Sequence, residues 1–304
     1  MRMHLSSSFV GRRFVARRYL AIAAVQAMLL TGLAVSLFSQ APAGAPAGGP
    51  PGAAPGGRAA GGRGGAKGGA PKQPSAPTPR YPDGHPMLSA PPGQIGYWNS
   101  GTGSITGKGG NGLPTNLDIS EVPFQPWAKA LYEARNATQS RNDPHVRCTP
   151  PGGPRQFHTP FGLLIYEIPE AKRVLVLSGG GPREWRVIYT DGRPHPSGED
   201  VAPTYLGHSV GKWEGDTLVV DTVGFNEKFW MTRSGLPHTE ALHLTERISR
   251  PDFNTLKYEV TIDDPRTYTR PWSGGHIISW VPNQDFEEYF CQDNNRDMDH
   301  MVGK

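Results

Sequence analysis

The stretch Leu256-Lys257-Tyr258-Glu259-Val260-Thr261-Ile262-Asp263 carries the clearest structural signal in this chain of 304 residues. Its apolar and polar residues alternate, so Leu256, Tyr258, Val260 and Ile262 share one face. Alternation with a period of two predicts a half-buried β-strand. The run Leu242–Ser249 before it also alternates, and the short connection between the two predicts an antiparallel hairpin.

Further strand patterns lie on both sides of this hairpin, at Leu163–Ile168, Arg173–Ser178, Trp185–Tyr189, Tyr205–Trp213, Thr217–Val223, Ile277–Val281 and Phe286–Cys291. About nine strands with short connections and no helices between them indicate a mainly β domain with antiparallel pairing. We expect a lipocalin-like barrel, with a β-sandwich as the alternative, because both arrangements hide the strand edges. The segment Gly211-Lys212-Trp213 is reminiscent of the Gly-x-Trp sequence of lipocalins.

The residues that precede these strands predict a short helical and coil extension. Tyr81–Gly112 is rich in Gly, Pro and Ser and predicts surface coil. Pro126–Gln139 predicts a helix, because Pro126 fits a first turn and Ala128, Leu131 and Tyr132 form an apolar stripe.

The first eighty residues have a different composition from the rest. The arginines at positions 12, 13, 17 and 18 precede the uncharged stretch Tyr19–Phe38, which predicts that residues 1–40 form a signal peptide or a signal anchor. Residues 41–80 are rich in Gly, Pro and Ala and predict a disordered linker, which leaves residues 81–304 as a single domain. Both alternatives predict an exported domain, either periplasmic or anchored to the inner membrane and facing the periplasm.

The charge distribution argues against a nucleic-acid partner. Residues 1–80 hold ten of the 31 basic residues and no acidic residue, whereas residues 81–304 hold 21 basic and 27 acidic residues. The expected folded domain is therefore acidic, the reverse of a nucleic-acid-binding domain. Membrane contact is expected only through the N-terminal segment.

The two cysteines of the chain are Cys148 and Cys291. No C-x-x-C pair is present, which argues against a zinc knuckle or a thioredoxin-type site. In an exported protein the two cysteines are expected to form one disulfide, with two separate buried thiols as the alternative.

Three polar residues interrupt faces that are otherwise apolar, and they are our candidate catalytic residues. Glu246 lies among Leu242, Leu244 and Ile248, Asp221 lies between Val219 and Val223, and His208 lies between Leu206 and Val210. A carboxylate on a core face is costly unless it is paired, protonated or open to a cavity. Asp221, Glu246 and His208 are therefore expected either to line a cavity and supply acid–base groups, or to make structural contacts such as an ion pair of Glu246 with Arg247 or Arg270.

A second set of residues is predicted to bind a ligand. Arg193 and His195 belong to a Gly/Pro turn expected at a barrel mouth, and His238 and Glu240 share a face of an extended segment. Trp230 and Trp272 lie in predicted connections, where they either stack on a ring-shaped ligand or pack in the core. The other strand aromatics, including Trp185 and Tyr189, are expected mostly in the core. The spacing of His238 and His243 misses that of a helical metal pair, and we expect no metal and no cofactor.

Three segments resemble a widespread family of uncharacterised bacterial exported proteins. They are TDGRPHP (190–196), GHSVGKWEGDTLVVDTVGF (207–225) and HTEALHLTER (238–247). The resemblance extends over about Pro144 to Lys304, implies one domain behind a signal sequence, and brings no established activity.

Two functions fit these features. The first is an exported β-barrel domain that binds a small organic ligand; if it is an enzyme, we expect lyase, isomerase or hydrolase chemistry with Asp221 or Glu246 as the base and a histidine as the acid. The alternative is a non-catalytic, tethered envelope protein that binds a polymer or a protein partner.

Overall fold

A computed structural model of the chain describes residues 75–101, 103–139, 141–197, 202–286 and 288–293. Two units can be distinguished, residues 1–67 and 68–304, and all described residues belong to the second. The predicted signal segment and residues 41–74 of the predicted linker lie outside the described residues. Among the helices that the structure does describe, none has the length and apolar character needed to cross a membrane.

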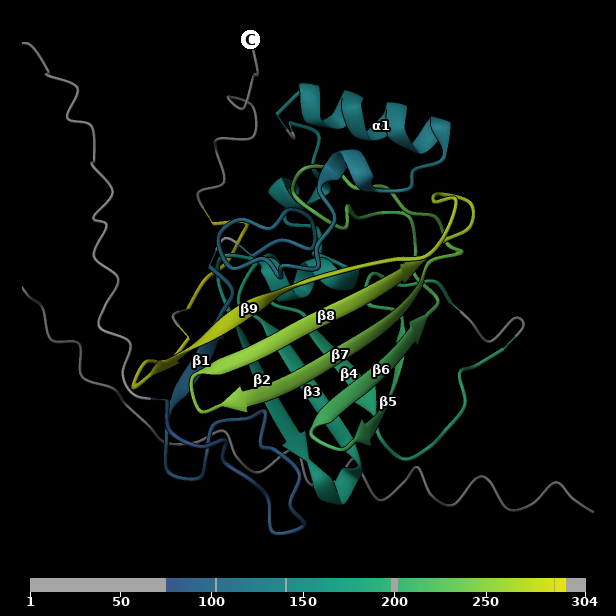
Figure 1. Cartoon of the computed structure of the whole chain (residues 1–304). Coiled ribbons are helices and arrows are strands. Elements are labelled where there is room, and N and C mark those ends of the chain that lie inside the picture. Colours follow the sequence, from purple (N-terminus) through teal and green to yellow (C-terminus); the bar gives the residue numbers. More distant parts are fainter. Residues whose placement is uncertain (1–74, 102, 140, 198–201, 287, 294–304) are drawn as a thin grey trace, which may run out of the picture. The chain divides into compact units, whose positions relative to one another are not determined.

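The described unit is a closed β-barrel in which neighbouring strands in sequence are neighbours in space (Figure 1). This confirms the mainly β fold and the barrel, rather than the sandwich. Pairing of β1 with β9 closes the ring, and every neighbouring pair is antiparallel except β4 and β5. The strands are β1 (Gly96–Asn99), β2 (Leu163–Ile168), β3 (Arg173–Ser178), β4 (Trp185–Tyr189), β5 (His208–Glu214), β6 (Thr217–Val223), β7 (His243–Asp252), β8 (Thr255–Asp263) and β9 (Trp272–Pro282).

The predicted helix is confirmed as α1 (Pro126–Ala137), with Pro126 in its first turn. Figure 1 shows α1 outside the barrel, at one end. Four short 3₁₀ helices complete the described elements: η1 (Ile119–Glu121), η2 (Pro144–Arg147), η3 (Gly153–His158) and η4 (Pro169–Ala171). Of these, η3 is largely buried, and its Phe157 stacks on Tyr258 inside the barrel at 4.3 Å between ring centroids.

The strand that closes the barrel was not predicted. β1 lies within the stretch predicted as coil, because it has only four residues between Gly- and Pro-rich segments. It carries its own Gly-x-Trp sequence, Gly96-Tyr97-Trp98, and the Arg250 guanidinium lies 4.9 Å from the Trp98 ring centroid. The strand predicted at Phe286–Cys291 is wrong, since no described residue of that range is in a strand.

The pairing of β4 with β5 has fewer residue pairs than any other pairing in the barrel wall except that of β1 with β2. Their parallel register contains two residue pairs, Ile188 with Ser209 and Tyr189 with Val210. A parallel neighbour requires a crossover connection, which here runs from Thr190 to Gly207. This connection brings its last residues alongside β4, where the pocket described below lies.

Candidate functional site

The barrel interior contains a buried ion pair between Glu246 of β7 and Arg186 of β4. Both nitrogens of the Arg186 fork donate to the two oxygens of Glu246, and the two side chains are 0% and 3% exposed. Burial would lower the pKa of Arg186, but the charge of Glu246 raises it, so the guanidinium stays charged. Glu246 therefore faces the core as predicted, but its partner is Arg186 rather than Arg247 or Arg270.

Three further side chains saturate this ion pair. Arg186 also donates from Nε to Ser209 at 2.8 Å and from a terminal nitrogen to Thr222 at 2.7 Å. The Tyr258 hydroxyl donates to Oε1 of Glu246 at 2.8 Å. Because these partners are themselves buried and the surrounding side chains form a continuous apolar core, Glu246 does not border the pocket described below. The geometry favours a structural role for Glu246.

Asp221 and His208 lie on the outer face of the barrel, so the prediction that they share a cavity with Glu246 is wrong. On β6 the inward residues are Leu218, Val220 and Thr222, and Asp221 points outward. Val219 is buried as well, so the apolar pattern did not distinguish the two faces. Before β5, Gly207 has a φ of +65°, which breaks the alternation counted from Leu206 and turns Ser209 inward.

On this outer face the structure brings four side chains together in a hydrogen-bonded row. The Nδ1 atoms of His208 and His195 are 2.8 Å apart, and His195 Nε2 lies 2.8 Å from Oδ1 of Asp221. The second carboxylate oxygen of Asp221 lies 2.7 Å from Nε2 of His243. The four residues come from β5, the β4–β5 connection, β6 and β7. We call them the histidine row.

The Asp221 carboxylate is the charged centre of the histidine row. Its partial burial would raise its pKa, but the hydrogen bonds from His243 and His195 lower it by more. Asp221 is thus ionised at neutral pH and accepts from both imidazoles. The histidine row joins three of the predicted site residues, Asp221, His208 and His195, with His243, for which the sequence predicted no role.

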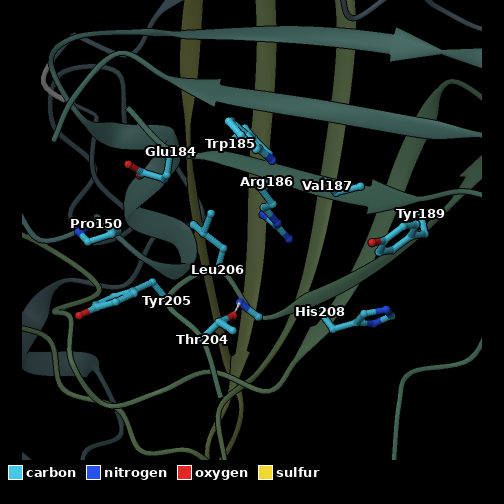
Figure 2. Close-up of a pocket in the computed structure, with 11 residues that line it drawn as sticks. Pro150, Glu184, Trp185, Arg186, Val187, Tyr189, Thr204, Tyr205, Leu206 and His208 are labelled. Carbon is cyan, nitrogen blue, oxygen red and sulfur yellow. Dashed lines mark hydrogen bonds between the residues drawn. The ribbon is translucent and has the colours of Figure 1, made fainter. Parts of the chain in front are cut away.

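A pocket of about 390 Å³ lies against the outer face of β4, and Figure 2 shows the residues that line it. Its wall is formed by Trp185, Val187 and Tyr189 of β4, together with Pro150, Glu184, Arg186 and the segment from Thr204 to His208. Figure 2 shows Tyr189 and His208 close to one another, away from Glu184, Pro150 and Tyr205. The volume falls in the range of small-molecule sites. His208 belongs to both the pocket and the histidine row.

The pocket wall contains aromatic residues that were expected in the core. Trp185 is 66% exposed, whereas its neighbours Arg186 and Ile188 are buried. The reason is the ion pair, because turning Arg186 inward to meet Glu246 turns the alternate residues outward. The outward face of β4 is therefore apolar, and at Trp185 it is open to solvent.

Glu184 is part of the pocket wall, and the sequence did not predict it. Both of its carboxyl oxygens are buried and have no hydrogen-bond partner among the described residues. Burial raises the pKa of Glu184 to about 7, so near neutral pH the group is balanced between its neutral and its charged form. Its position just before β4 gives no periodic signal by which the sequence could have identified it.

The other predicted ligand-binding residues lie away from the pocket. Trp230 and Trp272 are buried, the first under the Arg135 guanidinium and the second at the start of β9. His238 is buried against Phe229, and burial lowers its pKa. Glu240 is exposed. None of these four lines the pocket, and Trp230 and Trp272 show the core packing that the sequence left open.

Arg193 lies beside the histidine row. It forms an ion pair with Asp191 at 2.6 Å, and its guanidinium lies 3.9 Å from the Tyr189 ring centroid. The hydrogen bond from Arg193 lowers the pKa of Asp191 to about 2. Arg193 thus covers one face of the Tyr189 ring, which also stacks on His208 with 5.3 Å between the ring centroids.

Cys148 and Cys291 form a disulfide in the structure, the pairing expected from the sequence. It joins residues 143 positions apart and ties the C-terminal segment to the residue that follows η2.

Comparisons of the chain with protein-family models, with curated proteins and with solved structures give no match. Within the described residues, no three His, Cys, Asp or Glu side chains are arranged to hold a metal ion. The histidine row accordingly differs from a metal centre, since its members bond one another instead of converging on a point.

Proposed function

We propose that this domain binds a small organic molecule with a flat apolar ring in the pocket over β4. The observation that carries the proposal is the exposed Trp185 side chain within a concave wall that also contains Tyr189 and Tyr205. Aromatic rings on a rigid strand lose little conformational freedom when a ligand stacks on them. Covering roughly 100 Å² of the exposed Trp185 side chain would contribute about 2.5 kcal/mol.

Binding of 2-naphthol, a neutral bicyclic probe, tests this function. We expect saturable binding by the full chain, measured by the change in fluorescence on titration, and a loss of at least tenfold in affinity in Trp185→Ala. The matched control is Trp127→Ala, which removes a tryptophan of α1 that is 46% exposed and is not among the residues that line the pocket. Absence of binding by the wild-type chain, or equal weakening by both substitutions, would exclude the pocket as the site.

We also propose that the domain acts after export, in the periplasm or at the outer side of the inner membrane. The support is the N-terminal pattern of arginines followed by an apolar stretch, together with the disulfide between Cys148 and Cys291. Fusing alkaline phosphatase to the C-terminus in a Gram-negative host is expected to give activity outside the cytoplasm. Mass measurement of the mature chain then separates a cleaved signal peptide from a retained anchor.

A further inference from the structure

The histidine row determines where the proton of each imidazole lies. The Asp221 carboxylate has no proton to donate, so each histidine nitrogen that contacts it must carry the hydrogen. These nitrogens are Nε2 of His195 and Nε2 of His243, at 2.8 and 2.7 Å from the two carboxylate oxygens. Both hydrogen bonds are charge-assisted and hold the two rings in place.

The position of the proton on His195 then determines the state of His208. In the neutral state of His195, the ring that is protonated at Nε2 has a lone pair at Nδ1, which can only accept. The Nδ1 atom of His208, 2.8 Å away, must be the donor. The remaining nitrogen of His208, Nε2, therefore carries a lone pair, and it has no hydrogen-bond partner in the described part of the chain.

The groups around His208 favour its neutral form. Tyr189 from β4 stacks on the ring, while Arg193 and His195 approach from the β4–β5 connection. Burial lowers the pKa of His208 most, and the His195 ring in its protonated form and the Arg193 guanidinium lower it further. Asp221 and His243 face the far side of His195 and do not bond His208 directly. At neutral pH His208 is thus an uncharged imidazole whose Nδ1 is already occupied.

We propose that His208 is a general base for the molecule bound over β4, and that His195, Asp221 and His243 are positioning residues. The inference rests on the proposed binding function, because His208 contributes to the lining of that pocket. In the proposed step a C–H or O–H bond of the bound molecule breaks, its electron pair stays on the molecule, and the proton forms an N–H bond at Nε2 of His208. The imidazolium then returns the proton to the product or to water.

The first test measures the tautomer directly. In the full chain labelled with ¹⁵N-histidine, we expect His208 at neutral pH to show a protonated Nδ1 and an unprotonated Nε2. His195→Ala removes the acceptor, and His208 is expected to lose its preference for this tautomer. The control Asp216→Ala changes an exposed aspartate of the β5–β6 turn and should leave the His208 signals unchanged. A protonated Nε2 in the wild-type chain would overturn the proposal.

The second test measures base strength with 5-nitrobenzisoxazole, a flat bicycle of the size the pocket accepts. Removal of its carbon-bound proton by a base breaks the ring N–O bond, and the electron pair ends on the released phenolate, which absorbs visible light. We expect His208→Ala to lower the rate at least tenfold and His85→Ala, a control outside the pocket, to leave it unchanged. The wild-type rate should rise with pH to a plateau, with an apparent pKa below 6.5, because the neutral imidazole is the active form.

The variants also separate the two proposals. His195→Ala and Asp221→Ala are expected to lower the rate and move its pH profile, while 2-naphthol binding is retained. If 2-naphthol binds but His208→Ala reacts as fast as the wild type, the general base is refuted and the binding function stands. If the wild-type chain binds no 2-naphthol, the binding function itself is refuted.

Discussion

Replacing Arg186 with methionine is expected to destabilise the barrel severely. Methionine keeps most of the apolar volume but removes both bonds to Glu246 and those to Ser209 and Thr222. The Glu246 charge then stays buried with Tyr258 and Thr222 as its remaining donors. Removing one partner of a buried ion pair costs about 3–5 kcal/mol. For a domain of this size the same loss lowers Tm by about 6–20 °C.

The double variant Arg186→Met/Glu246→Leu separates the ion pair from general damage to the core. With no charge left inside the barrel, we expect it to recover at least about 2 kcal/mol relative to Arg186→Met, because apolar replacement of a buried pair is often neutral. Urea unfolding of the full chain followed by tryptophan fluorescence measures both values, provided that the m-value stays constant. A loss below about 1 kcal/mol in Arg186→Met, or a double variant no more stable than the single one, would refute the reasoning.

Three other substitutions test separate features of the fold. The pKa of Glu184 is about 7 in the folded chain, above the ordinary value of 4.5. The free energy of unfolding should therefore fall by about 3 kcal/mol as the pH rises from the lower value to the higher one. Glu184→Gln should remove this fall in urea titrations from pH 5 to 8. Replacing both Cys148 and Cys291 with serine should cost up to about 5 kcal/mol by the loop-entropy relation, and an unchanged urea midpoint would contradict that. A Cβ on Gly274 would lie 1.8 Å from the Ile105 carbonyl oxygen, so Gly274→Ala should cost about 1–3 kcal/mol, whereas the control Gly109→Ala, in open space, should unfold at the wild-type midpoint.

Strands in which apolar and polar residues alternate regularly could be predicted, because the alternation lies within the strand's own sequence. β8 alternates buried and partly exposed residues along its whole length, as its sequence indicates. β1 was not predictable in the same way, since its four residues become a strand only by pairing with β9. The two glycines Gly274 and Gly275 extend β9 beyond its predicted start, and they are required there because backbone oxygens lie where a Cβ would be.

Alternation alone did not show which residues of the strands with polar side chains on both faces point into the barrel. Glu246 was identified correctly as a core-facing carboxylate, but the sequence did not reveal its partner. Arg186 is 60 residues away in the chain, and it lies on a strand whose aromatic residues were expected to face the core. The energetic preference is clear once both are known. An unpaired buried carboxylate costs more than exposing Trp185, so the arginine takes the inward position.

The histidine row was anticipated in part, and the missing element was register. His195, His208 and Asp221 were all identified as candidates, but only the parallel pairing of Tyr189 with Val210 places the β4–β5 connection beside β6. That pairing also sets His208 under the Tyr189 ring, at the end of the pocket. One short parallel contact thus joins the pocket and the histidine row. The same contact explains why Asp221, predicted as a base, is better suited to orient one, since its two oxygens are occupied by His195 and His243 and the open lone pair is carried by His208.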